Sequence, residues 1–309
     1  MLVNPKKYLI EARKNKYAIG AFNTSDLEMT QAIIAAGNKL SHPIIVQVSP
    51  KAIEYAGLEN LSMIVKNEAQ KSKASIALHL DHGKSIDLVL KCLEVGFTSV
   101  MFDGSDLLFE ENIKKTKEVV DLAKKYGACV EGELGRVGHP ETVSGSNNGN
   151  EILDSHFTKV SRDRYVRTDS INNFTDPAKA KEFVEATGVD TLAVSIGNVH
   201  GVPSKDEKLD FDLLAQIAEK VKIPLVLHGA SSTPEKDIKK AISLGIAKIN
   251  IDTDIRMAFS GNLKAFQKSH PDIYDPREIL GSAKEAVEKV VEGKIKIFNN
   301  TNIQNQRSK

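Results

Sequence analysis

The feature that most constrains how this chain can fold is a regular alternation of short β-rich runs with amphipathic helical stretches. Several runs consist almost entirely of Ile, Val, Leu and Ala, as is typical of strands buried on both faces of a parallel sheet. The alternation therefore predicts an α/β fold. The eight runs are Tyr17–Phe22, Pro43–Ser49, Ser75–Asp81, Thr98–Asp103, Ala128–Glu133, Val189–Gly197, Pro224–His228 and Ile246–Ile251.

The stretches between these runs carry the signals of helix ends. Polar side chains that can accept a hydrogen bond from a free backbone N–H predict N-caps at Ser25, Asp106 and Thr233. Glycine follows the last turn of four stretches, at Gly96, Gly127, Gly188 and Gly245. The six predicted helical stretches are Ser25–Lys39, Lys84–Val95, Asp106–Tyr126, Asp176–Thr187, Phe211–Val221 and Pro234–Leu244.

Eight strand-then-helix units can form either an open, doubly wound sheet or a barrel. A dinucleotide-binding open sheet needs a Gly-x-Gly-x-x-Gly turn after its first strand, and residues 22–25 read Phe-Asn-Thr-Ser instead. The number and even spacing of the units favour a (β/α)₈ (TIM) barrel, and 309 residues suit one such domain with insertions. We therefore expect residues 1–309 to form a single TIM-barrel domain.

Two segments depart from a minimal barrel. Residues 139–175 are far longer than an ordinary loop between strands, so we expect an inserted mobile loop between the fifth and sixth strands. The chain from Thr253 onward is predicted to add C-terminal helices, the last over Asp275–Phe298. Residues 299–309 form a polar tail that is expected to fray.

Composition excludes several classes of function. The 42 Lys and Arg residues nearly cancel the 41 Asp and Glu residues, which gives no global electrostatic reason to expect nucleic acid or an anionic membrane as partner. No apolar run approaches the roughly 18 residues of a membrane span, and the N-terminus lacks a signal-peptide core. Two cysteines build neither a disulfide framework nor a cysteine zinc site. We expect a soluble, cytoplasmic protein.

Histidines gather where the chemistry of such a barrel is expected. The active site of a TIM barrel lies at the carboxyl ends of its strands. Three of the eight histidines, His82, His200 and His228, follow the third, sixth and seventh runs. Three imidazoles that converge from different strands are the ligand set of a catalytic zinc with one open position. Each histidine taken alone also fits an ordinary hydrogen-bonded polar residue.

A second constellation indicates phosphate binding. Residues 227–232 follow the seventh run, and residues 250–253 follow the eighth and lead directly into a helix. Small residues let backbone N–H groups approach an anion, and a helix N-terminus adds its dipole. The alternative is that Gly229 only makes a tight turn.

Three other polar residues have competing interpretations. Asp81, beside a predicted ligand, is well placed for proton transfer on a bound substrate. His79, inside the same run, is expected to orient a neighbour by hydrogen bonding. Lys248 can in principle form a Schiff base with a ketone, although a metal would make this redundant.

At this point six motifs, in order, resemble those of the class II (zinc-dependent) ketose-bisphosphate aldolases. The resemblance runs from Tyr8 to about Lys296, and it rests on several independent motifs rather than on any one of them. The motifs are Ala77–His82, Met101–Gly104, Val130–Gly135, Ile196–Gly201, Leu225–Ser231 and Lys248–Thr253.

The resemblance implies roles for the metal and proton-transfer residues. His82, His200 and His228 match the zinc ligands, and Asp81 matches the acid/base that serves the C4 hydroxyl of the ketose. Asp103 and Glu133 match positions that hold a second or alternative metal. Glu141 falls where the family has a mobile-loop glutamate that exchanges a proton with substrate C3, although the sequence around it departs from the family's usual glycine- and acid-rich run. The family also commonly holds a monovalent cation, Na⁺ or K⁺, beside the phosphate.

The resemblance further implies contacts to the substrate. Gly201, residues 229–231 and residues 250–253 match the contacts to dihydroxyacetone phosphate. Asn23 and Ser49 match positions near the substrate. Arg256 can hold the second phosphate with two parallel hydrogen bonds. The implied substrate-binding residues are Asn23, Ser49, Gly201, Gly229, Ala230, Ser231, Asn250, Ile251, Asp252, Thr253 and Arg256.

We therefore expect reversible cleavage of fructose 1,6-bisphosphate into two triose phosphates by a homodimer or higher homo-oligomer. A tagatose-1,6-bisphosphate aldolase of the same family is the nearest alternative, and Asp252 is the residue expected to discriminate between the two sugars. The competing interpretation of Asp252 is a helix cap before Thr253. A non-catalytic barrel subunit is a further alternative, but such a subunit has no need of three histidines and Asp81.

Overall fold

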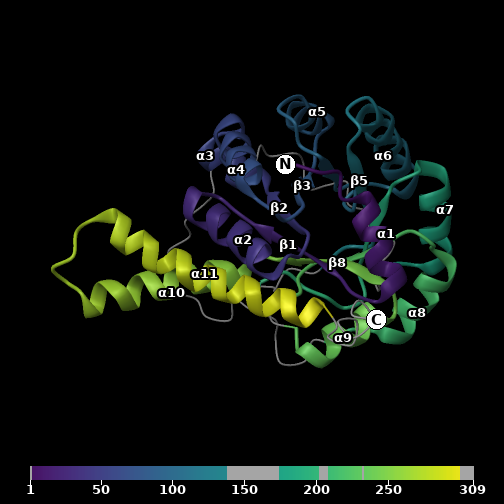
Figure 1. Cartoon of the computed structure of the whole chain (residues 1–309). Coiled ribbons are helices and arrows are strands. Elements are labelled where there is room, and N and C mark those ends of the chain that lie inside the picture. Colours follow the sequence, from purple (N-terminus) through teal and green to yellow (C-terminus); the bar gives the residue numbers. More distant parts are fainter. Residues whose placement is uncertain (1, 138–173, 202–207, 232, 300–309) are drawn as a thin grey trace, which may run out of the picture.

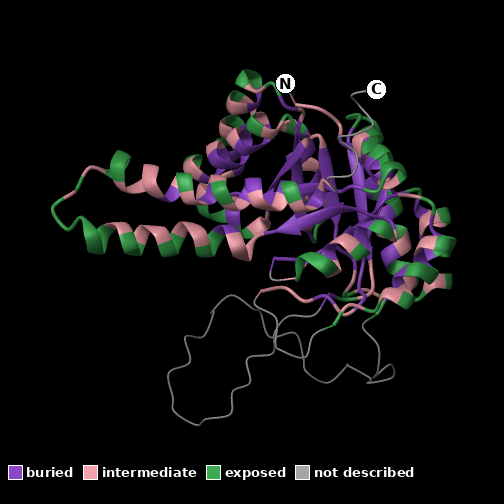
Figure 2. Cartoon of the chain, turned by 60° about the horizontal axis from the view of Figure 1, so that its bottom comes forward, coloured by how far each residue is buried: buried purple, intermediate pink, exposed green. Residues whose placement is uncertain are grey.

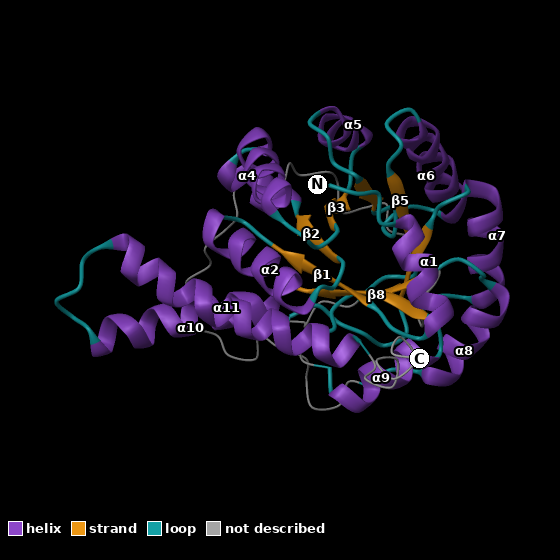
Figure 3. Cartoon of the chain, viewed as in Figure 1, coloured by secondary structure: helices purple, strands orange, loops and turns teal. Residues whose placement is uncertain are grey.

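The computed structural model describes residues 2–137, 174–201, 208–231 and 233–299. Within them eight parallel strands close into a barrel in sequence order, and β8 pairs with β1. The strands form a ring enclosed by helices (Figure 1, Figure 3), which confirms the predicted (β/α)₈ barrel. The strands are β1 (Ile19–Asn23), β2 (Ile44–Val48), β3 (Ile76–Gly83), β4 (Ser99–Phe102), β5 (Cys129–Leu134), β6 (Thr191–Val194), β7 (Leu225–Leu227) and β8 (Ile246–Ile251).

The described residues form eleven helices, and all six predicted stretches are among them. Three additional helices precede β1 or lie between β2 and β3, namely α1, α3 and α4. The helices are α1 (Lys6–Asn15), α2 (Leu27–Leu40), α3 (Pro50–Ala56), α4 (Leu58–Lys71), α5 (Ile86–Glu94), α6 (Phe109–Lys124), α7 (Pro177–Thr187), α8 (Phe211–Lys220), α9 (Glu235–Ser243), α10 (Thr253–Ser269) and α11 (Pro276–Phe298).

The three predicted N-caps are wrong. Asp26, one residue after Ser25, caps α2 by accepting a hydrogen bond from Met29 N–H. Leu108 is the N-cap of α6, and the carboxylate of Asp106 pairs with Lys84 at 2.6 Å. Residue 234, after Thr233, is the N-cap of α9. The predicted glycine ends are confirmed, since all four glycines have positive φ angles.

The core lies between the strand ring and the helices. Every residue of β1, β2 and β8 is buried, as expected for strands covered on both faces. Figure 2 shows the buried strands enclosed by helices whose exposed residues face outward. Parallel strands all end at the same side of a barrel, so the side chains that follow β3, β4, β5, β7 and β8 meet at one mouth.

The C-terminal helices leave the barrel as a projecting hairpin (Figure 1). Helix α11 packs on α2 and α10, and its buried residues include Ala283, Val287 and Val291. In α10, by contrast, Ile255 is the one buried residue.

Two expectations fall largely or wholly outside the described residues. The predicted inserted loop is described only at Phe174 and Thr175, and the predicted tail only at Asn299. None of the described helices combines the length and the apolar character needed to span a membrane.

Candidate active site

The structure brings the three predicted histidine ligands together at the mouth of the barrel. His82 ends β3, His200 lies in the loop after β6, and His228 directly follows β7. Their ring centroids are 5.1 Å (His82–His200), 4.7 Å (His82–His228) and 6.0 Å (His200–His228) apart. One ring nitrogen of each lies within 4.8 Å of the others, so the three can share one metal ion.

A local irregularity of β3 lets two consecutive residues reach this mouth. Side chains of a regular strand alternate between its two faces, so Asp81 and His82 would otherwise point apart. The register between β3 and β4 shifts between Leu80 and Gly83, and His82 has a φ of 51°. A non-glycine residue in this left-handed region is uncommon, although histidine tolerates it better than most residues. The strained backbone thus serves the placement of both side chains.

Carboxylates orient two of the three imidazoles. His82 Nδ1 lies 3.0 Å from Asp103 Oδ2, and His228 Nε2 lies 2.8 Å from Glu131 Oε1. The other ring nitrogens, His82 Nε2 and His228 Nδ1, face each other at 3.0 Å. A metal-binding histidine usually donates its outer N–H to such a carboxylate, which leaves the inner lone pair for the ion.

The charges around these histidines differ. Burial lowers the pKa of His82, but Asp81, Asp103 and Glu133 outweigh it and raise that pKa to about 9. Burial dominates at His228 and lowers its pKa. Binding of a metal cation at His82 must therefore displace a proton over the neutral range.

Glu133, Asp103 and His82 form a second group with metal-ligand spacing. Burial, reinforced by the charge of Asp103, raises the pKa of Glu133 to about 8. Glu133 Oε2 is buried without a hydrogen-bond partner among the described residues, and it lies 3.8 Å from His82 Nδ1. A cation would satisfy this oxygen. Because a neutral imidazole has one lone pair, His82 cannot serve both groups at once.

Asp81 is held by three amide side chains. Its Oδ2 accepts from Asn23 Nδ2 at 2.9 Å, and its Oδ1 accepts from Asn250 Nδ2 at 3.2 Å. Gln47 Nε2 donates to Asn23 Oδ1 at 2.6 Å and so fixes the first amide. Burial raises the pKa of Asp81, but nearby His82, His228 and Lys248 and the Asn23 hydrogen bond lower it to about 2. Asp81 is therefore a fixed, ionised carboxylate.

A cavity of about 850 Å³ lies over this site, and Asp81, His82 and His200 are among the residues that line it. Nine of the eleven predicted substrate-binding residues line it, whereas Ala230 and Ile251 are buried in the hydrophobic core. Ser49 Oγ accepts from Ala52 N–H, and Ser231 Oγ from Asp252 and Asp254 N–H, which leaves each hydroxyl proton free to donate into the cavity. The nine are Asn23, Ser49, Gly201, Gly229, Ser231, Asn250, Asp252, Thr253 and Arg256.

The turn after β7 requires glycine. Gly229 has a φ of 64°, and a Cβ atom there would lie 2.0 Å from the carbonyl oxygen of Val199. The backbone can therefore approach a ligand closely at this point. The alternative interpretation, that Gly229 makes a tight turn, describes the same geometry.

Asp252 occupies the N-cap position of α10 but does not cap the helix with its side chain. The side chain makes no capping hydrogen bond to α10, and its Oδ1 accepts from Arg256 Nε at 2.6 Å instead. Burial raises the pKa of Asp252. The competing interpretation of Asp252 as a helix cap is therefore wrong, and the carboxylate stays at the cavity wall.

Sequence reasoning missed several residues of this site. Gln47 is the single polar residue of an otherwise apolar buried strand, and Glu131 shares its buried strand with Glu133, signals that could have identified both. The cations Lys51, Lys84 and Arg136 line the cavity but lie in loops or at a helix start, where no periodic pattern marks them. Predicted Glu141 lies outside the described residues.

His79 and Lys248 lie below the mouth. Lys248 Nζ is 2.8 Å from Glu131 Oε2, and both side chains are 1% exposed. A lysine held as an ammonium by a buried carboxylate is a poor Schiff-base nucleophile. His79 Nδ1 lies 2.7 Å from Ser99 Oγ, in keeping with an orienting rather than a metal-binding role.

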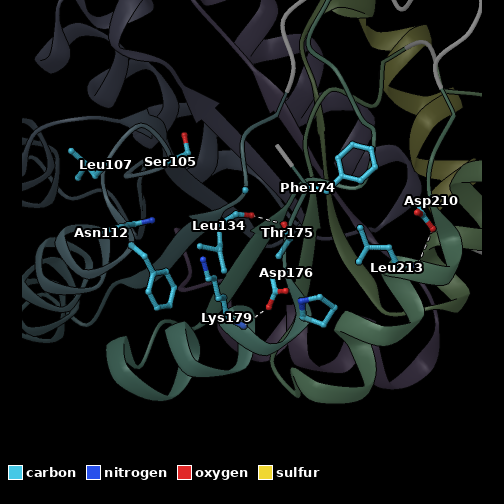
Figure 4. Close-up of a pocket in the computed structure, with 13 residues that line it drawn as sticks. Ser105, Leu107, Asn112, Leu134, Phe174, Thr175, Asp176, Lys179, Asp210 and Leu213 are labelled. Carbon is cyan, nitrogen blue, oxygen red and sulfur yellow. Dashed lines mark hydrogen bonds between the residues drawn. The ribbon is translucent and has the colours of Figure 1, made fainter. Parts of the chain in front are cut away.

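A second cavity of about 600 Å³ lies beside the starts of α6, α7 and α8 (Figure 4). Its carboxylates already serve the fold: Asp176 caps α7 and Asp210 caps α8. Thr175 Oγ1 donates to the carbonyl of Leu134 at 2.5 Å. No group of metal-ligating side chains was found among the described residues around it. The two groups with metal-ligand spacing among the described residues, by contrast, lie at the mouth.

Comparisons with known proteins find relatives along nearly the whole chain. Residues 3–303 match the family model described as class-II fructose-bisphosphate aldolase. The fructose-bisphosphate aldolase of Thermus caldophilus is 40% identical over 321 residues, which span 96% of this chain and 98% of that protein. The crystal structure of the YdjI aldolase from Escherichia coli K12 is 34% identical, with a TM-score of 0.79 and coverage of 96% of this chain and 97% of that chain. The fructose-bisphosphate aldolase of Campylobacter jejuni is 25% identical, with a TM-score of 0.78 and coverage of 96% and 95%.

Proposed function

The chain belongs to the class-II fructose-bisphosphate aldolase family, and on that premise we propose which side chains carry its reaction. The reaction is the reversible cleavage of fructose 1,6-bisphosphate into dihydroxyacetone phosphate and glyceraldehyde 3-phosphate. The observation that carries the assignment is the convergence of His82, His200 and His228 beside the ionised Asp81 at one cavity.

The three histidines are the proposed ligands of a catalytic zinc ion. Three neutral imidazoles with an open fourth position are a typical donor set for catalytic zinc, and Asp103 and Glu131 already orient two of them. When bound, zinc supplies Lewis-acid polarisation of the substrate carbonyl. Asp103 and Glu133, with the unpartnered Glu133 Oε2, are the proposed ligands of an alternative metal position that shares His82.

Asp81 is the proposed base in the cleavage direction. Its low pKa keeps the carboxylate unprotonated at neutral pH, and Asn23 and Asn250 fix its two oxygens. It can then accept the proton of the C4 hydroxyl as the C3–C4 bond breaks, and return it in synthesis. The proposal of Glu141 as the group that exchanges the C3 proton rests on the family resemblance alone.

The proposed binding site for one phosphate lies between the ends of β7 and β8. Gly229 allows close approach of backbone, Ser231 has a hydroxyl proton to donate, and Thr253 begins α10 without a side-chain cap. A helix N-terminus of this kind favours an anion. Arg256, at the same wall, is the proposed contact to the second phosphate. A monovalent cation, Na⁺ or K⁺, is a further proposed ligand beside the first phosphate.

The two sugar bisphosphates test this function directly. Cleavage rates on fructose and tagatose 1,6-bisphosphate, each with and without chelator, separate the alternatives. We expect faster cleavage of the fructose compound, loss of activity with chelator and recovery on addition of Zn²⁺. Faster cleavage of the tagatose compound would move the assignment to the C4 epimer. Full activity in metal-free protein would overturn the zinc proposal, and no cleavage of either sugar would favour a non-catalytic subunit.

The proposed assembly is a homodimer. The hairpin of α10 and α11 projects from the barrel, and its exposed residues include Met257 (57% exposed) and Tyr274 (92% exposed). Although α10 packs on α11, Ile255 is its one buried residue, so a second copy is the proposed partner for the rest of its surface. Sedimentation equilibrium should give twice the mass of the chain, and a monomer at micromolar concentration would contradict this.

A further inference from the structure

Inside the barrel, beneath the proposed zinc site, four buried polar and charged side chains form one connected network. Glu131 extends inward from β5, Lys248 from β8, His79 from β3 and His228 from the end of β7. The side chains of Glu131, Lys248 and His79 are each 1% exposed, and that of His228 is fully buried. An ion pair at this depth is costly to bury, so its retention calls for an account beyond stability.

Both oxygens of Glu131 are committed to different partners. Oε1 lies 2.8 Å from His228 Nε2, and Oε2 lies 2.8 Å from Lys248 Nζ. Lys248 Nζ also lies 3.4 Å from His79 Nε2, while His79 Nδ1 contacts Ser99 Oγ at 2.7 Å. An ammonium group can only donate hydrogen bonds, so Lys248 requires Glu131 Oε2 to be an acceptor. The positive charge of Lys248 also keeps Glu131 an ionised carboxylate.

This arrangement determines which nitrogen of His228 carries the proton. A carboxylate at Oε1 can only accept, so Nε2 of His228 must be the N–H donor. The lone pair of the neutral ring then lies on Nδ1. Nδ1 is the nitrogen that faces His82 Nε2 at 3.0 Å, toward the centre of the three histidines.

We propose that Lys248, acting through Glu131, is a positioning residue that fixes the metal-binding tautomer of His228. This inference rests on the proposed zinc site, and it assigns to the barrel lysine a role different from Schiff-base formation. Lys248 touches neither the proposed ligands nor the cavity, and its effect passes through one carboxylate. A purely structural ion pair would leave the tautomer of His228 to other groups.

Replacement of the carboxylate by an amide separates these alternatives. In Glu131→Gln, the amide has one acceptor and one donor end, and Lys248 requires the acceptor. The NH₂ group must then face His228 Nε2, which moves the ring proton to Nδ1 and removes the inward lone pair. We expect zinc affinity, measured by competition with a chromophoric chelator, to fall about 10- to 100-fold.

A second substitution should restore part of what the first removes. In Glu131→Gln/Lys248→Met, no cation competes for the amide oxygen, so the oxygen can turn to His228 Nε2–H. We expect zinc to bind about tenfold more tightly to the double variant than to Glu131→Gln. The matched control is Asp190→Asn, which breaks a 2.7 Å pair with Lys6 at the other end of the barrel and should leave zinc affinity unchanged.

The outcomes distinguish this inference from the function on which it rests. Failure of the wild-type chain to bind zinc would overturn the proposed zinc site itself. Normal zinc binding by the wild type, with a double variant as weak as Glu131→Gln or weaker, would overturn the role of Lys248 alone. If Glu131→Gln does not fold, two Lys248 variants replace it in the test. Lys248→Arg should keep the zinc affinity within a few-fold of wild type, while Lys248→Met should lower it about tenfold. Equal zinc affinities of Lys248→Arg and Lys248→Met would overturn the inference.

Discussion

The two ends of the barrel both gather charged residues, but they use them differently. At the N-terminal end, a cavity of about 560 Å³ is lined by cations that include Lys6 and Arg13. Arg13 Nη2 donates to the carbonyl oxygens of Ala218 and Val221, at the end of α8, and Lys6 pairs with Asp190 at 2.7 Å. Cations at helix C-termini stabilise the helix dipole, so these contacts serve the fold.

At the mouth, the charged and polar groups are held in costly arrangements. Glu133 Oε2, Gln47 Oε1 and Asn250 Oδ1 are buried without hydrogen-bond partners among the described residues, against Arg13 Nη1 at the other end, and His82 has a positive φ. Buried unsatisfied atoms and backbone strain reduce stability, and they persist where function requires them. We therefore expect substitutions at the mouth to lower activity more than folding stability. At the N-terminal end, substitutions should lower folding stability more than activity.

The largest expected effect comes from His82→Asn. Asparagine tolerates the left-handed backbone, so the fold should keep its melting temperature within a few degrees. Loss of one of three imidazoles should release zinc and lower kcat/KM for fructose 1,6-bisphosphate by about 10⁴-fold or more. Bound metal, thermal unfolding and cleavage rate are measured on the same sample. A variant that unfolds early but retains zinc would break the comparison.

Asp81→Ala should have the next largest effect and should separate proton transfer from metal binding. Removal of a positioned base lowers kcat by about 10²–10⁴-fold, while zinc, held by the histidines, should remain bound. Zinc content and kcat are the two measurements. Loss of zinc in this variant would show that Asp81 supports the metal site rather than the proton transfer.

The metal-free chain should lose stability as pH rises. The folded-state pKa of Glu133 is raised to about 8, so folding favours its neutral form, and this stabilisation is lost between pH 4.5 and 8. The pKa of His82, raised to about 9, acts in the same direction from pH 6.5 upward. The lowered pKa values of His79 and His228 act in the opposite direction below pH 6.5, so we expect the free energy of unfolding to fall by roughly 2–4 kcal/mol from pH 6.5 to pH 8.5.

Glu133→Gln is the control for this pH dependence. The amide stays neutral at every pH, so the contribution of Glu133 to the slope should be absent in denaturant titrations, and the fall that remains above pH 6.5 should be that of His82. Saturating zinc should also flatten the wild-type profile, because a cation stabilises the charged carboxylate. An unchanged slope in Glu133→Gln would assign the effect to other groups.

Arg13→Met tests the opposite end of the barrel. The substitution removes two hydrogen bonds to the carbonyl oxygens of Ala218 and Val221 and should cost about 1–3 kcal/mol of unfolding free energy. Because the site is remote from the mouth, kcat and KM at 25 °C should stay within twofold of wild type. A tenfold fall in kcat without loss of stability would contradict the division of roles between the two ends.

The barrel could be predicted because its pattern repeats. Eight apolar runs and four helix-ending glycines follow the same strand-then-helix repeat. The structure contains all eight strands and all four glycine helix ends. Helix starts were less predictable, since Ser25 and Asp26 are adjacent and both can cap, and only the backbone geometry selects Asp26. The sequence pattern does not predict α3 and α4, because a regular barrel has one helix after each strand and two follow β2.

The candidate site was predictable where residues follow a strand end, and less so inside the barrel. The strand-end rule located the histidines and Asp81, but it assumes regular alternation and cannot foresee the irregularity that turns both Asp81 and His82 to the mouth. Pairings such as Glu131 with Lys248 join strands far apart in the sequence, so no spacing reports them.

The smallest expected effect concerns the choice of sugar, at Asp252. Fructose and tagatose bisphosphates differ only in the direction of the C4 hydroxyl, so selectivity depends on groups beside the reacting carbons. Asp252 lies at the wall of the cavity, is not used as a helix cap, and keeps one oxygen, Oδ2, beyond the pair that Oδ1 makes with Arg256. That oxygen can accept a hydrogen bond from a substrate hydroxyl in one orientation.

Asp252→Ala should therefore change the preference more than the fold. Its side chain is 38% exposed, so water partly replaces a lost hydrogen bond. We expect the ratio of kcat/KM values, fructose over tagatose compound, to fall about tenfold, or about 1.4 kcal/mol. Asp254→Ala is the matched control, because that carboxylate pairs with Lys294 and does not line the cavity. Equal losses on both sugars in Asp252→Ala would instead assign Asp252 to holding Arg256, since that guanidinium would meet a phosphate common to both substrates.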